Sequence, residues 1–210
     1  SEMCIRDRRM TVRHALDIVQ IEGLIDRKRG RAGGTFVRAT PPALSLTSGR
    51  SALDQLREHG LDVEVRVLSL TFIDAPGHLA STFDIEEGDS VWECRTVQVS
   101  AGSPIMASTL LIPQALAPSL TEEDVQKPLT ELLTDLGLAP VFKRDSLVAA
   151  TARTEEQKAL AVGRNQPVLR ITRTIKAEGG VVAAQLEETL RPDAATVEVV
   201  IGEDPTPTLD

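Results

Sequence analysis

Apolar residues near the start of the chain recur first with the period of a helix and then with that of short strands. Four of them lie at positions i, i+3, i+4 and i+7 and so share one helix face: Val12, Ala15, Leu16 and Val19. Gly23 follows where a residue in the left-handed conformation would end this helix. Residues 24–25 and 35–37 predict two short strands, and the loop 26–34 between them carries four basic residues and three glycines. We therefore expect a helix followed by a small hairpin with a basic tip.

From residue 51 onward, runs with the period of a strand alternate with runs with the period of a helix. Strands are predicted at 63–73, 91–99, 104–113, 142–152, 168–177, 181–190 and 195–201. Helices are predicted at 51–59, 76–83, 128–136 and 154–162. In the last helix, Thr154 is the expected N-cap and Gln157 the residue that completes a capping box. Hairpins joined by helices predict an antiparallel sheet with helices on one face, which is an α+β fold.

Residues 39–50 are rich in proline, serine and threonine and show no periodicity, so we interpret them as a linker. The chain is therefore expected to divide into a head at 1–38, the linker at 39–50, a larger domain at 51–201 and a loose acidic tail at 202–210.

Charge is distributed unevenly between these parts. The net charge of −8 argues, taken alone, against a nucleic-acid partner. Residues 1–40, however, contain nine Lys and Arg against five Asp and Glu, whereas the remainder contains fourteen against twenty-six. A basic head on an acidic body is typical of a protein that contacts phosphate with one end only. A helix that begins with polar and cationic residues and is followed by a basic hairpin is also how a winged helix-turn-helix binds duplex DNA.

The overall composition bounds the remaining classes of protein. Hydrophobic residues make up 41% and aromatic residues 2%, so the core must consist mainly of aliphatic side chains. No run approaches the eighteen or so apolar residues that span a bilayer, and no secretory signal pattern is present. Cys4 and Cys94 are far apart and have no metal-binding or redox spacing. We therefore expect a cytoplasmic protein without a metal or other cofactor.

The head resembles the end of the DNA-binding domain of GntR-family transcriptional regulators. In that family the recognition helix reads approximately Ser-Arg-x-Thr-Val-Arg-x-Ala-Leu, and the wing ends Gly-x-Gly-Thr-Phe-Val. The matching residues are Arg9, Thr11, Val12, Arg13, Ala15 and Leu16 in the helix, 22–25 in the joint, and Gly34, Thr35, Phe36 and Val37 in the wing. The resemblance implies two sets of contacts to double-stranded operator DNA: Arg9, Thr11 and Arg13 in the major groove, and Arg29, Gly30 and Gly34 in the wing.

A complete domain of this kind has two helices before the recognition helix, on the order of forty residues. Here eight residues precede the match. We therefore expect an N-terminally incomplete, partial winged helix-turn-helix, in which Val12, Leu16 and Val19 lack helices to pack against.

Residues 50–201 resemble the UTRA ligand-sensing domain, which has a chorismate-lyase-like fold. The matching landmarks, in order, are 87–91, Arg95, Gly102, Pro104, 112–113, 167–169, Arg173, 179–180, Arg191 and Asp193. Together with the head, this resemblance places the chain near the HutC-like subfamily. It implies a one-component regulator, expected to be a repressor and a homodimer, whose C-terminal domain binds a small effector and thereby alters operator affinity.

Period-two counting along the strands indicates where an effector could bind. Five polar or charged residues fall on otherwise apolar strand faces: Arg95, Ser108, Arg144, Arg173 and Glu188. A buried guanidinium without an anionic partner is costly, so each arginine needs a carboxylate or a ligand. Three arginines against one glutamate favour an anionic effector such as a phosphonate, a sugar phosphate or a carboxylate. The alternative is that these side chains reach water at strand ends or pair with acidic residues elsewhere.

The resemblance also contains departures from the family pattern. Arg95 matches the first arginine of an Arg-x-Arg strand motif whose second arginine is replaced by Val97. Ser108 and Ala184 stand where the family often has glutamates. In sugar-phosphate sensors those positions bind hydroxyls, so the departures favour a phosphonate over an amino-sugar phosphate.

Two other functions remain open from the sequence. A stand-alone ligand-binding domain without DNA activity follows if the head is truncated. A chorismate-lyase-like enzyme shares the sensor fold, but His14, His59 and His78 have no partner spacing, and no nucleophile, phosphate-loop or metal motif is present. We therefore expect a non-enzymatic protein.

Overall fold

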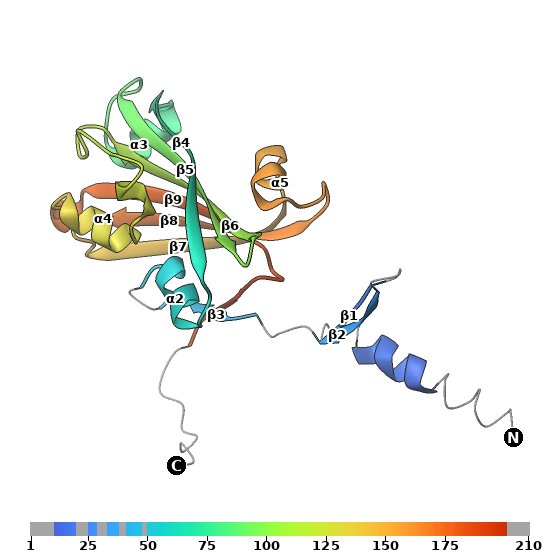
Figure 1. Ribbon diagram of the computed structural model, residues 1–210. Coiled ribbons are helices and arrows are strands. Elements are labelled where there is room, and N and C mark those ends of the chain that lie inside the picture. Colours follow the sequence, from blue (N-terminus) through green and yellow to red (C-terminus); the bar gives the residue numbers. More distant parts are fainter. Residues whose placement is uncertain (1–10, 20–24, 29–32, 38–40, 48–49, 201–210) are drawn as a thin grey trace, which may run out of the picture. The chain divides into compact units, whose positions relative to one another are not determined.

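The computed structural model describes residues 11–19, 25–28, 33–37, 41–47 and 50–200 (Figure 1). The chain divides into two compact units, residues 1–41 and 42–210. None of the helices within these described ranges is long and apolar enough to cross a bilayer.

The first unit contains the predicted helix and hairpin. Residues 11–19 are helical, and β1 (Ile25–Lys28) pairs antiparallel with β2 (Gly34–Val37), with Lys28 opposite Gly34. The expected helix end at Gly23 lies outside the described residues. On the predicted apolar face of this helix, Val12 is 59% exposed, whereas Leu16 and Val19 are half-buried.

The second unit is built on a six-stranded antiparallel sheet of order β4-β5-β6-β9-β8-β7, which confirms the predicted α+β class. Its strands are β4 (Val63–Asp74), β5 (Ser90–Ser100), β6 (Ser103–Pro113), β7 (Phe142–Thr151), β8 (Pro167–Lys176) and β9 (Val182–Leu190). The helices are α2 (Ala52–Glu58), α3 (Gly77–Phe83), α4 (Leu129–Asp135) and α5 (Thr154–Leu160), with short 3-10 turns η1 (Asp124–Gln126) and η2 (Glu178–Gly180).

The helices cover both faces of this sheet, not one face as the sequence predicted (Figure 1). On one face, Leu132 and Leu133 of α4 pack with Leu110, and α2 covers the end of the same face. On the other face, α3 packs on Leu111 and α5 packs through Leu160. The adjacent leucines of β6 therefore contribute to two separate cores, because successive strand residues point to opposite faces.

Two local expectations were wrong. Ala43–Ser45, inside the predicted linker, forms strand β3, which pairs in parallel with β10 (Thr196–Glu198). The final strand is correspondingly shorter than the expected 195–201. The sequence did not predict β3 because a strand of three residues is too short to show a period.

The N-cap of α5 is Arg153 and not Thr154. The Glu156 carboxylate accepts a hydrogen bond of 2.6 Å from the Arg153 backbone N–H, as a capping-box residue does. Gln157 instead donates its side-chain amide to the Ala152 carbonyl at 2.7 Å. The sequence pattern was therefore correct in kind but displaced by one residue.

The hairpin between β5 and β6 sets which side chains face each side of the sheet. Its turn residues Ala101 and Gly102 both have positive φ, 48° and 76°, as a two-residue hairpin turn requires. Ser100 lies opposite Ser103, but beyond the turn the register shifts by one residue. Thr96 consequently lies opposite Ser108. This β-bulge positions the site described next.

Candidate functional site

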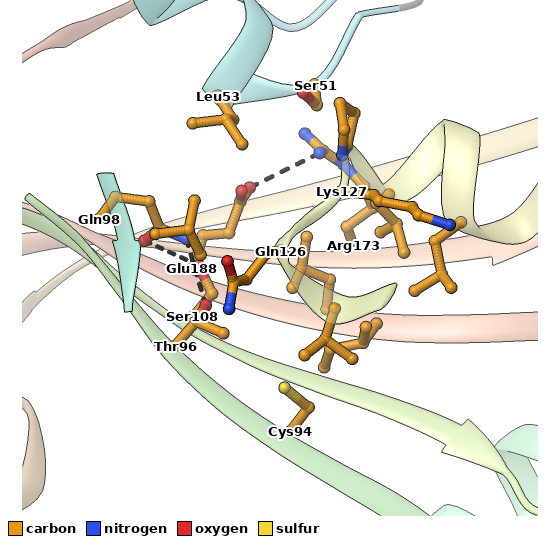
Figure 2. Close-up of a pocket in the computed structure, with 17 residues that line it drawn as sticks. Ser51, Leu53, Cys94, Thr96, Gln98, Ser108, Gln126, Lys127, Arg173 and Glu188 are labelled. Carbon is orange, nitrogen blue, oxygen red and sulfur yellow. Dashed lines mark hydrogen bonds and ion pairs between the residues drawn. The ribbon is translucent and has the colours of Figure 1, made fainter. Parts of the chain in front are cut away.

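A cavity of about 70 Å³ lies between the sheet and the α2, η1 and α4 segments (Figure 2). Strand residues with polar side chains line it together with Leu110 and Leu186, and Ser51 of the α2 N-cap lies at its margin. The structure brings three of the five predicted effector residues into this cavity: Ser108, Arg173 and Glu188. The lining of this cavity, which is mostly apolar with a few converging polar groups, has the composition of a ligand site.

Buried hydroxyl and amide groups form one side of this cavity. Thr96, Gln98 and Ser108 are all buried. The Gln98 side-chain amide donates to the Thr96 hydroxyl at 3.2 Å, and the Ser108 hydroxyl donates to the Gln98 carbonyl oxygen at 3.4 Å (Figure 2). These bonds use only part of the capacity of an amide and two hydroxyls, so the group can also bind a polar ligand.

Arg173 forms the charged side of the cavity. Its Nε and Nη2 donate to the two carboxylate oxygens of Asp145 at 2.7 and 3.1 Å, and both side chains are only 7% exposed. Asp145 lies directly opposite Arg173 in the β7–β8 ladder. The guanidinium therefore has the carboxylate partner that its burial demands, supplied by the neighbouring strand.

Glu188 lies on the remaining side of the Arg173 guanidinium, 3.6 Å from Nη1 (Figure 2). Its Oε2 is buried and accepts no hydrogen bond from any residue in the described part of the chain. Burial raises the pKa of Glu188, although the nearby Arg173 opposes this effect. A raised pKa favours the neutral carboxylic acid, which can both donate and accept a hydrogen bond.

A second cavity, of about 230 Å³, lies beside the first and shares Ser51, Leu129 and Arg173 with it. Arg50 and Lys143 also line it, and none of its described lining residues is acidic. Burial lowers the pKa of Lys143, and the positive charge of Arg173 acts in the same direction. The two cavities together therefore offer hydroxyl and amide groups on one side of Arg173 and cationic groups on the other.

Arg95 does not face these cavities, contrary to the prediction. It lies on the opposite face, in a larger groove of about 760 Å³ that Leu79 of α3 and Glu155 of α5 also line. There it pairs with Glu155 and, at 3.0 Å, with Glu93, and the hydrogen bond that Arg95 donates to Glu93 raises the pKa of Arg95. The physical reason is the bulge, which places Thr96 instead of Arg95 across from Ser108.

Arg144 also lies outside both cavities, exposed on β7. The prediction rested on its apolar neighbours Phe142 and Val148, but these are themselves 50% and 55% exposed. Neither of these residues belongs to a hydrophobic core of the described chain, so the apolar alternation on this face of β7 does not correspond to a buried face.

Sequence reasoning missed several residues of the site: Ser51, Thr96, Gln98, Lys143 and Asp145. Thr96 and Gln98 could have been found by counting outward from the Ala101-Gly102 turn with one extra residue in the second strand. Asp145 could have been found by pairing Arg173 with an acidic residue on the adjacent strand.

Burial raises the pKa of the Cys94 thiol, which lines the first cavity, to about 12. The thiol therefore remains protonated at neutral pH and lacks the thiolate that nucleophilic catalysis requires.

The predicted DNA contacts are described only in part. Thr11 and Arg13 are exposed on the helix of the first unit, and Gly34 is exposed at the start of β2. Arg9, Arg29 and Gly30 lie outside the described residues.

The structure is similar to solved structures of bacterial regulators. PhnF from Mycobacterium smegmatis matches with a TM-score of 0.73 at 21% identity, covering 97% of this chain and 91% of PhnF. The effector domain of the same protein matches with a TM-score of 0.69 at 17% identity, covering 79% of this chain and all of that domain. A GntR-family transcriptional regulator from Bacillus cereus matches with a TM-score of 0.61 at 16% identity, over 67% of this chain and 99% of that one.

No protein of curated function matches the sequence significantly. The sequence pattern described as the UTRA domain, in contrast, matches residues 58–196, which include the whole six-stranded sheet. Because this match spans more than half of the chain, the protein belongs to the UTRA domain family.

Proposed function

We propose that this chain is a one-component, DNA-binding transcriptional regulator of the GntR family and its HutC-like subfamily. In this proposal the UTRA domain binds a small anionic effector that alters operator binding, and the protein is a cytoplasmic repressor, not an enzyme. The observation that carries the proposal is the pair of cavities around Arg173 in a UTRA domain that follows an exposed helix and hairpin.

The first unit supports the DNA-binding part of the proposal. Thr11 and Arg13 project from an exposed helix, and a hairpin with Lys28 opposite Gly34 follows it. A helix of this kind enters the major groove, where arginine can bind guanine with two hydrogen bonds, while a hairpin wing contacts phosphates.

The charges around Arg173 support an anionic effector. If Glu188 is neutral, Arg173 and Lys143 together face a single carboxylate, that of Asp145. The local surplus of positive charge would attract a phosphonate, phosphate or carboxylate group into the second cavity, near Ser51. The buried Ser108, Gln98 and Thr96 would then bind the rest of the effector in the first cavity.

The edge strand β7 supports the proposed homodimer. It spans ten residues, pairs only with β8 among the described strands, and exposes Phe142, Leu147 and Val148. A long edge strand with exposed apolar residues is a template for pairing with another strand. We propose that β7 of a second copy pairs with it antiparallel, as a two-fold axis would permit.

Arg13→Ala should remove sequence preference, at a cost of about 1–3 kcal/mol of discrimination, because base-edge contacts carry sequence information. Arg29→Ala should weaken binding evenly across sequences, because phosphate contacts carry no sequence information. It should also reduce the slope of the logarithm of affinity against the logarithm of salt concentration by about 1. Fluorescence anisotropy with promoter and scrambled DNA at several salt concentrations measures both. Equal loss of selectivity in the two variants contradicts these roles, and absence of binding to any promoter fragment at low salt contradicts the regulator proposal.

Calorimetric titration of the full chain with inorganic phosphate, alkylphosphonates, sugar phosphates and urocanate should identify a binding anion. Ser108→Ala should weaken that binding by about 0.5–1.5 kcal/mol, the value of one hydrogen bond. Thr109→Ala is the matched control, since Thr109 is the next residue of the strand and lines the groove of the opposite face. No heat from any anion, or an equal effect of the two variants, would argue against this site.

Glu188→Gln should stabilise the fold more at high pH than at low pH. A carboxyl whose folded-state pKa exceeds its unfolded value of about 4.3 holds its proton more tightly in the folded chain. Ionisation therefore destabilises the wild type progressively as pH rises above that value, and the amide variant avoids this loss. Denaturant unfolding at about pH 5 and about pH 8 measures the difference. A constant loss of stability in Glu188→Gln at both pH values would contradict the prediction.

Val148→Lys should convert the proposed dimer to monomers, because it places like charges near the two-fold axis of the strand pair. Sedimentation equilibrium of the full chain over a range of concentrations measures the change. Val181→Lys, another exposed valine but at the η2–β9 junction, is the control and should not alter association. A dimer that tolerates Val148→Lys excludes β7 as its interface.

A further inference from the structure

Residues 42–46 are the first part of the second unit, immediately after its boundary with the first. They are held to the sensor domain by several backbone contacts. The side chain of Gln55 in α2 accepts from the Ser45 N–H at 2.7 Å and donates to the Ser45 carbonyl at 3.1 Å. The Thr196 N–H donates to the Pro42 carbonyl at 2.9 Å. Because this segment joins the second unit to the first, a change in its backbone contacts alters the connection to the head.

Lys143 contacts the same segment from the edge of the sheet. Its ammonium donates to the Leu46 carbonyl at 3.0 Å, and it lies 3.8 Å from the Asp145 carboxylate. The same side chain lines the second cavity beside Arg173. Lys143 therefore lines the second cavity and also donates a hydrogen bond to the backbone of residues 42–46.

The contacts form a continuous series from the first cavity to this segment. Glu188 lies 3.6 Å from Arg173, Arg173 is bound at 2.7 and 3.1 Å by Asp145, and Asp145 faces Lys143. All three of these side chains are almost fully buried, so their interactions are little screened by water. Burial lowers the pKa of Lys143, and the charges of Arg173, Asp145 and Glu188 lie close enough to act on it as well.

We propose that Lys143 transmits occupancy of the effector cavity to residues 42–46. An anion bound beside Arg173 competes with the Leu46 carbonyl for the Lys143 ammonium, and loss of that bond loosens the segment that joins the sensor domain to the head. This inference rests on the proposed effector site and specifies how that site acts on the rest of the chain. Coupling of this kind requires a contact whose strength differs between the empty and occupied states, and the Lys143–Leu46 bond is such a contact.

Lys127 provides a matched comparison. It lines the first cavity, which adjoins the one that Lys143 lines, and its ammonium donates to Asp124 at 3.3 Å and to Asp135 at 3.0 Å, both from the η1–α4 region. Its described contacts do not reach residues 42–46. The two lysines carry the same charge and line adjacent cavities, but they contact different parts of the chain.

The test uses hydrogen–deuterium exchange of the full chain without effector or DNA, so that its failure is distinguishable from failure of the proposed regulator function. Lys143→Met should raise exchange at the Ser45 and Leu46 amides by about fivefold or more, the lower end of typical coupling between sites. Exchange in the central strand β9 should not change, which separates local loosening from global destabilisation. Lys127→Met should leave the Ser45 and Leu46 amides as in the wild type.

Asp145→Asn and the double variant Asp145→Asn/Lys143→Met test the series of contacts. The single Asp145 change should also raise exchange at Leu46, relative to β9, because it removes the carboxylate between Arg173 and Lys143. In the Lys143→Met background it should add nothing. Wild-type exchange in Lys143→Met, an equal effect in Lys127→Met, or an additive effect in the double variant would each overturn the proposal.

Discussion

The ion pair between Arg173 and Asp145 is the interaction on which the site depends. A buried guanidinium needs a carboxylate partner, and removing one partner of such a buried pair typically costs about 3–5 kcal/mol. The cross-strand position of Asp145 supplies this contact and fixes the plane of the guanidinium. As a result Nη1 is directed toward Glu188, and the guanidinium separates a polar cavity from a cationic one.

The two faces of the sheet differ in how their basic side chains are paired with acidic ones. On the groove face, each arginine is matched by carboxylates: Arg95 with Glu93 and Glu155, Arg153 with Glu187, and Arg170 with Glu156. These pairs connect α5 to the strands and leave little charge for a ligand. On the cavity face, four basic residues (Arg50, Lys127, Lys143 and Arg173) and one acidic residue, Glu188, line the two cavities, and burial raises the pKa of Glu188. The two faces therefore differ both in composition and in burial.

Most of the fold could be predicted from the sequence, because long strands and helices have clear periods. The predicted strands of the sheet end within one residue of their observed ends, and Ser108, Arg173 and Glu188 were assigned to the correct face. The errors arose where period alone is insufficient. A single extra residue after the Ala101-Gly102 turn exchanges the faces of Arg95 and Thr96 relative to Ser108. The exposure of Arg144 depends on which face of β7 is covered in the folded chain, which is a property of the tertiary structure and not of local sequence.

Counting arginines along the strands located only part of the candidate site. Of the three arginines predicted to bind the effector, only Arg173 lines the two cavities, and it already has a carboxylate partner. The positive character of the site comes instead from Arg173 combined with Lys143 and Arg50, which no strand-face pattern connects, since Arg50 precedes α2 and Lys143 lies on the edge strand. The periodicity of individual strands cannot detect a site that forms between an edge strand and a helix N-cap. It becomes evident only when sheet order brings β7 and the start of α2 to the same cavity.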